Sequence, residues 1–139
     1  MPLSIESVPA AGHPEVAVLA LAGELDASNY ETLVDRVRSA YADGARKLVL
    51  DMSALTFMAS SGLVALYSAV RIMRGEAPPD PEAGWGAIHD MEEDHGASGD
   101  VRLAGPPSPV YRVLDRTGLI RLFQIDETVA ASLAAFGAG

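Results

Sequence analysis

Short apolar runs alternate with amphipathic segments along this chain, and that alternation constrains its fold more than any other feature. Four runs have the length of strands: VAVLALAG at 16–23, KLVLDMS at 47–53, VRLAG at 101–105 and IRLFQI at 120–125. In segments that follow them, apolar residues recur every three or four positions, as on one face of a helix. Strands that alternate with helices indicate an α/β fold with a mixed sheet.

Capping signals predict where the first two helices begin and end. Ser28 and Glu31 have the spacing of a capping box, and Gly44 suits the left-handed position after a helix. Ser60 precedes the next amphipathic segment, so we expect it to be an N-cap. Gly75 would end that second helix.

Two later helices carry similar signals. Ser108 would cap the first of them, with Pro109 at its first helical position, and Asp126 would cap the last. A chain of 139 residues is long enough for one layered core. We therefore expect one domain over residues 1–139, a mixed four- to five-stranded sheet flanked by about four helices.

Residues 76–100 depart from this pattern. The segment holds eight acidic residues and no lysine or arginine, together with three prolines and four glycines. Only Trp85, Ile88 and Met91 are sizeable apolar side chains, too few to build a core. We expect a mobile acidic loop inserted into the domain.

Composition excludes several classes of protein. The net charge of −9 disfavours nucleic acid and anionic membranes as partners. No apolar run is long enough to span a membrane, and the first residues lack the pattern of a signal peptide. The absence of cysteine excludes disulfides, thiolate metal sites and cysteine nucleophiles. These features predict a cytoplasmic protein.

The stretch FMASSGL, residues 57–63, places two serines and a glycine where the second helix should start. On spacing alone, the simpler interpretation is that Ser60 only caps that helix. A helix N-terminus also favours an anion, including the phosphate of a phosphoserine. The residues themselves leave both interpretations open.

Enzyme and metal sites fit the sequence poorly. Met58 stands where the first glycine of a nucleophile elbow would belong. The three histidines, His13, His89 and His95, are not placed to complete a catalytic triad. Acidic residues around His89 and His95 would attract a divalent cation only weakly, because they lie on no rigid element. We expect no enzymatic activity, no cofactor and no metal site.

Three blocks of the sequence carry a further signal: LAGELDASNYETLVDRV, KLVLDMSALTFMASSGLVAL and VRLAGPPSPVYRVLDRTGLIRLF. They resemble the signature of STAS domains, and within that family they are most similar to bacterial anti-sigma factor antagonists. The resemblance implies a small cytoplasmic domain that works by partner switching. The unphosphorylated antagonist binds an anti-sigma factor that is also a GHKL-type serine kinase. Phosphorylation by that kinase breaks the complex, and a serine phosphatase restores the antagonist.

Matched residue by residue, Ser60 corresponds to the phosphorylated serine of these antagonists. Ala59 stands where the family usually has aspartate, so a charge beside the acceptor is missing. Asp26 matches the turn after the first block, which in the family lies close to the phosphoserine, although aspartate is equally typical of ordinary turns. The resemblance implies a partner-binding surface with these members: Asp26, Ser28, Met58, Ala59, Ser60, Ser61 and Gly62.

Two functions follow from the resemblance. The first is an anti-sigma factor antagonist, monomeric or a weak homodimer, that is switched at Ser60. The second is a STAS scaffold or sensor module of a larger assembly that is not switched there, an interpretation that Ala59 favours.

Overall fold

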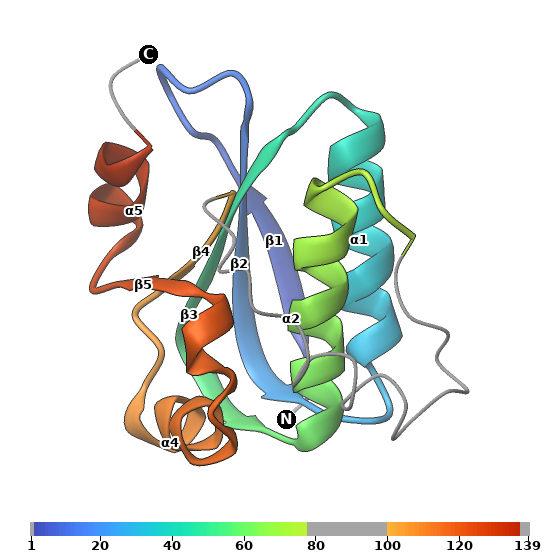
Figure 1. Ribbon diagram of the computed structural model, residues 1–139, viewed down its shortest axis with the longest axis vertical. Coiled ribbons are helices and arrows are strands. Elements are labelled where there is room, and N and C mark those ends of the chain that lie inside the picture. Colours follow the sequence, from blue (N-terminus) through green and yellow to red (C-terminus); the bar gives the residue numbers. More distant parts are fainter. Residues whose placement is uncertain (1, 78–99, 137–139) are drawn as a thin grey trace.

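Five strands form one mixed sheet in the order β1-β2-β3-β4-β5 (Figure 1). The computed structural model describes residues 2–77 and 100–136. The strands are β1 Ser4–Val8, β2 Val16–Leu25, β3 Lys47–Met58, β4 Val101–Ala104 and β5 Gln124–Asp126. The edge strand β1 runs antiparallel to β2, whereas β2 to β5 are parallel to one another. The predicted α/β class with a mixed sheet is confirmed.

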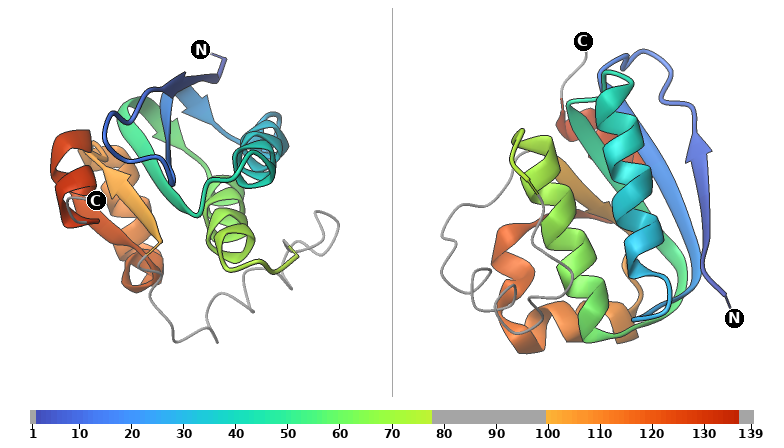
Figure 2. Two further views of the ribbon diagram at one scale, coloured as in Figure 1. Left: turned by 90° about the horizontal axis from the view of Figure 1, so that it is seen from above. Right: turned by 90° about the vertical axis from the view of Figure 1, so that its right-hand side faces the viewer.

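Helices cover both faces of the sheet. In the described residues the α-helices are α1 Tyr30–Ala42, α2 Ser60–Met73, α4 Ser108–Thr117 and α5 Val129–Ala135, and a 3₁₀ turn η2 spans Leu119–Leu122. Figure 2 shows α1 and α2 side by side on one face of the sheet, with α5 on the opposite face. This arrangement leaves the two ends of the parallel strands free to carry loops.

Strand β3 divides the core into two parts. Leu48 and Leu50 point into the larger part, which also contains side chains of α1, α2 and α4. Val49, between them, points to the smaller part, where it meets side chains of α5. This alternation is the period of two that a strand imposes, and it explains why the run at 47–53 is apolar on both sides.

Strand β3 is longer than the sequence predicts, because it continues to Met58. Two bulges interrupt its ladder with β2. In the bulged half, Met52, Leu55 and Met58 are buried, and each interval between them holds two exposed residues. A bulge adds an unpaired residue to one strand, so the period of two that identifies strands is lost here. Residues 54–58, which lie beyond the predicted run at 47–53, are therefore part of the same strand.

Two of the predicted N-caps, Ser60 and Ser108, are the first residues of their helices. The residues before them, Ala59 and Pro107, have extended backbones, and no side chain caps either helix. The carbonyl of Pro107 accepts the amide of Val110 at 3.0 Å, so the helical turn begins one residue earlier than predicted. Pro109 is therefore the second helical residue and not, as the sequence predicted, the first.

The other two predicted N-caps have side chains that are engaged elsewhere. Ser28 bonds to a neighbouring carboxylate, and α1 begins at Tyr30. Asp126 is the last residue of β5, and its carboxylate pairs with Arg102 at 2.7 Å. The side chain of Thr128 caps α5 instead. Short polar side chains compete for several local bonds, so spacing alone does not place a cap.

The ends of the chain differ from the sequence predictions in other ways. Strand β1 was not predicted, since SIESV is short and mostly polar. The run at 120–125 begins as η2 and becomes a strand only at Gln124.

Gly44 and Gly75 have positive φ angles of 112° and 81°, which confirms them as left-handed helix stops. Residues 78–99 of the predicted acidic insertion lie outside the described residues.

Candidate functional site

The parallel ends of β2 and β3 bring two predicted parts of the site together. Leu25 and Met58 are register partners, and the amide of Ala59 donates to the carbonyl of Leu25 at 2.9 Å. Asp26 follows Leu25 directly, and Ser60 follows Ala59. The turn after β2 and the start of α2 are therefore neighbours at the carboxyl end of the sheet, the lower end of Figure 1.

The turn after β2 is fixed by its own polar side chains. Oδ1 of Asp26 accepts the amide of Ser28 at 2.9 Å and the hydroxyl of Ser28 at 2.5 Å. Asn29 closes the turn from the other side, since its Oδ1 accepts the Asp26 amide at 2.9 Å and its Nδ2 donates to the Glu24 carbonyl at 2.8 Å. The hydroxyl of Ser28, followed by its amide, lowers the pKa of the Asp26 carboxyl. Asp26 thus holds the turn in shape as an ionised side chain.

Ser60 is exposed in the first turn of α2. Ala59 before it is extended, with φ −83° and ψ 170°, so the chain turns sharply from β3 into the helix. The first turn carries no acidic side chain that would neutralise the positive end of the helix dipole. A hydroxyl in this position is open to modification, and an anion on it would lie in a favourable field.

Behind Ser60 the helix packs closely on the strands. A Cβ on Gly62 would lie 2.5 Å from Cγ of Met58 and 3.1 Å from the side chain of Leu25. Only glycine fits this approach without displacing a core side chain. The hydroxyl of Ser61 is buried without a hydrogen-bond partner among the described residues.

The residues predicted to bind a partner therefore differ in exposure. Ser28 and Ser60 are exposed, and three further members are partly exposed: Asp26, Ala59 and Ser61. Met58 and Gly62 are buried, so they position the turn rather than offer side chains at its surface.

Phe57 was missed as a site residue by the sequence reasoning. Its side chain is 48% exposed, three residues before Ser60. The second bulge of β3 turns Thr56 and Phe57 outward together, between the buried Leu55 and Met58. The available signal was a large aromatic residue directly beside a polar motif, which is a common feature of protein-binding surfaces.

The described residues contain no group of three metal-ligating side chains. The cation candidates around His89 and His95 lie outside the described residues. His13 is the one histidine that the structure describes, and it lies before β2, at the opposite end of that strand from Ser60. It is not placed to activate the Ser60 hydroxyl. Within 2–77 and 100–136, no helix has the length and apolar character needed to cross a membrane.

The comparison with known families decides the classification. The model of the STAS domain matches residues 7–76, half of the chain, including both the Asp26 turn and the start of α2. This chain belongs to the STAS domain family. No curated protein matches it.

Solved structures agree with that assignment. An anti-sigma factor antagonist from Mycobacterium paratuberculosis superposes with a TM-score of 0.68 at 22% identity, covering 96% of this chain and 93% of that chain. The anti-sigma factor antagonist SpoIIAA in its unphosphorylated form gives a TM-score of 0.66 at 18% identity, covering 96% and 97%. Bacillus SpoIIAA in the phosphorylated form gives 0.54 at 18% identity, covering 96% and 99%. The STAS domain therefore has the fold of these antagonists.

Proposed function

We propose that this STAS domain is an anti-sigma factor antagonist that acts by partner switching, with Ser60 as its phosphorylation site. The observation that carries the proposal is the exposed Ser60 hydroxyl at the start of α2, beside the turn that Asp26 holds. Its fold is that of antagonists, one of which exists in unphosphorylated and phosphorylated forms. In its unphosphorylated state the protein binds an anti-sigma factor that is a GHKL-type serine kinase.

A phosphate on Ser60 would change binding rather than the fold. The group would lie against the amides of the first turn of α2, where a negative charge stabilises a helix by about 0.3–1 kcal/mol. At a contact surface, the same doubly charged group would lose water without gaining a cation. Phosphorylation therefore releases the kinase while the domain stays folded. A serine phosphatase returns the protein to its binding state.

The residues of the site have different roles in this proposal. Ser60 carries the switch, and the exposed Phe57 and Ser28 belong to the contact surface around it. Asp26 keeps the turn after β2 in shape, and the buried Met58 and Gly62 hold α2 against the strands. The protein acts in the cytoplasm as a monomer or weak homodimer, without enzymatic activity, a metal or a cofactor.

A second function is favoured by Ala59. The usual aspartate beside the acceptor would add a negative charge that could orient the hydroxyl or bind a cation with the kinase's nucleotide. Ala59 offers neither, and the first turn of α2 supplies no other acid. On this alternative the domain is a scaffold or sensor module of a larger signalling assembly and is not switched at Ser60.

Phosphorylation can be tested with purified components. Each GHKL-type serine kinase of the source organism is incubated with the domain, magnesium and ATP, and the product is analysed by mass spectrometry. We expect one phosphate, localised to Ser60, that is absent from Ser60→Ala and retained in Ser61→Ala. Ser61→Ala is the matched control because its hydroxyl is adjacent but buried.

The same assay separates the two functions. Phosphorylation that becomes faster in Ala59→Asp, with wild type still modified, supports the antagonist with a weakened acceptor. If no kinase modifies wild type or Ala59→Asp, the switch is excluded and the scaffold function remains.

A further inference from the structure

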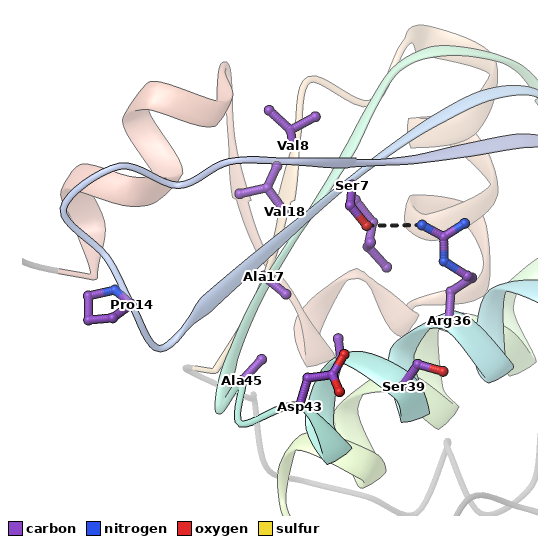
Figure 3. A pocket seen from close by; sticks show the side chains of 11 residues that line it. Ser7, Val8, Pro14, Ala17, Val18, Arg36, Ser39, Asp43 and Ala45 are labelled. Carbon is purple, nitrogen blue, oxygen red and sulfur yellow. Dashed lines mark hydrogen bonds between the residues drawn. The ribbon is translucent and has the colours of Figure 1, made fainter.

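A pocket of about 330 Å³ lies between the β1–β2 hairpin and the C-terminal half of α1 (Figure 3). It is at the amino ends of the parallel strands, the opposite end of the domain from Ser60. Volumes of this size are in the range of small-molecule sites. Neither the STAS assignment nor the proposed switch uses this pocket.

The pocket exists because small side chains line the space between the helix and the hairpin. Ala17 comes from β2, Ser39 and Ala40 from α1, and Ala45 from the loop that follows α1. Val8 and Pro14 add apolar surface on the hairpin side. Among the described residues, no large side chain fills the gap that these small ones leave.

Two opposite charges flank this apolar space. The guanidinium of Arg36 donates to the Ile5 carbonyl at 3.1 Å and to the Ser7 hydroxyl at 3.0 Å, so its position is fixed. Asp43 directly follows the last residue of α1, and Figure 3 shows Ser39 between its carboxylate and Arg36. Within the described residues, neither Arg36 nor Asp43 has an ion-pair partner.

The helix sets the distance between the backbone positions of these two residues. Arg36 lies in α1 and Asp43 directly follows the last residue of this helix, seven positions on, so their Cα atoms are separated by about 10 Å. A direct ion pair does not form across that gap. Opposite charges that are held apart beside one pocket match the carboxylate and the ammonium group of a single zwitterionic molecule.

We propose that this pocket binds a small zwitterion of the α-amino acid class with an apolar side chain. Its carboxylate pairs with the preformed guanidinium of Arg36, which offers donors beyond the two already used. Its ammonium group pairs with Asp43, and its side chain packs against Val8, Pro14 and Ala17. An uncharged ligand would leave both charges unmatched, and an anion alone would be repelled by Asp43.

An NMR titration of the ¹⁵N-labelled protein tests this site. Each standard α-amino acid is added in turn, and we expect at least one with an apolar side chain to shift the amides of Ser7, Ala17 and Ala40. The expected dissociation constant is about 1 mM or tighter. The matching amine and the matching carboxylic acid, each lacking one of the charged groups, should bind about tenfold more weakly or worse.

Variants separate the site from general effects on the fold. Asp43→Asn removes one charge from a side chain that forms no ion pair among the described residues, and it should weaken binding about tenfold or more. Ser39→Leu should fill the space and abolish binding. Arg38→Gln is the matched control, because Arg38 lies on the same helix, is 57% exposed and pairs with Asp35 outside the pocket.

The outcomes are decisive in both directions. Binding that is lost in Asp43→Asn and Ser39→Leu but retained in Arg38→Gln supports the site. The proposal is overturned if no amino acid shifts the pocket amides, if Asp43→Asn binds like wild type, or if the carboxylic acid alone binds as tightly as the amino acid.

Discussion

Ser60 is the first residue of α2 and not its cap, and this changes what its substitutions should do. The side chain makes no capping bond, and Ala59 occupies the N-cap position. We expect Ser60→Ala to change the free energy of unfolding by no more than about 0.5 kcal/mol in a urea titration. At a true N-cap, the same substitution would lower the free energy of unfolding by about 1 kcal/mol. A loss of that size would show that the hydroxyl caps the helix in solution.

Gly62 provides a sharper test of the packing beneath Ser60. Alanine is the better helix former by about 1 kcal/mol, so an open site would gain stability from Gly62→Ala. The new Cβ would lie 2.5 Å from Met58, and overpacking of this kind costs about 1–3 kcal/mol. We expect a net loss of stability by urea unfolding. Ser61→Ala is the control, and a stabilised Gly62→Ala would contradict the close approach of α2 to the strands.

At the scale of the elements, α5 is joined to the sheet by a partly buried polar cluster. Arg102 donates to both carboxylate oxygens of Asp126, at 2.7 and 3.1 Å, and the buried hydroxyl of Ser132 donates to the same carboxylate at 2.8 Å. Arg102 also lies over the ring of Phe136, 5.6 Å from its centroid. This cluster connects β4, β5 and α5.

Asp126→Asn should weaken that connection. The substitution removes the charge that Arg102 pairs with, and charge-assisted hydrogen bonds contribute about 1.5–3 kcal/mol to stability. We expect a loss of this order in urea unfolding at neutral pH. Asp35→Asn is the control, because the exposed pair of Asp35 and Arg38 is 3.9 Å long and should be worth less than about 1 kcal/mol. Equal losses in both variants would show that the cluster adds nothing specific.

The stability that the pair of Asp126 and Arg102 contributes should change with pH in a defined direction. The hydrogen bond from Arg102, followed by that from Ser132, lowers the pKa of Asp126 in spite of its partial burial. A lowered folded-state pKa gives stability that is present above the carboxyl's ordinary pKa and lost as the pH falls through the folded value. The stability difference between wild type and Asp126→Asn should therefore be constant near neutral pH and shrink below about pH 4. A difference that grows on acidification would contradict this assignment.

Hydrophobic periodicity and capping residues predicted which helices and strands exist better than they predicted the residues at which these elements begin and end. The apolar runs located β2, β4 and the first half of β3, because buried strands need apolar side chains on both sides. The second half of β3 was missed, since its two bulges replace alternation with one buried residue in three. The cap predictions failed at Ser28 because it bonds to Asp26, two residues before it, and at Asp126 because it pairs with Arg102, which only the folded sheet brings near.

For the whole molecule, the sequence was sufficient for the fold class, whereas the role of Ser60 as a switch stays a prediction. The alternation of elements gave the class, and the family resemblance singled out Ser60 and Asp26. Exposure could not be predicted in the same way. Met58 is buried and Phe57 exposed because of a bulge, and the charges of Arg36 and Asp43 acquire a shared pocket only when β1 packs beside α1.

The central claim is that charge on Ser60 controls partner binding without controlling the fold. The direct measurement is calorimetric titration of the cognate GHKL-type kinase with wild type, Ser60→Ala and Ser60→Asp, each shown by thermal melting to be folded. We predict that Ser60→Ala binds like wild type and that Ser60→Asp binds at least about tenfold more weakly, about 1.4 kcal/mol. If Ser60→Asp bound the kinase as tightly as wild type, Ser60 would not be the switch.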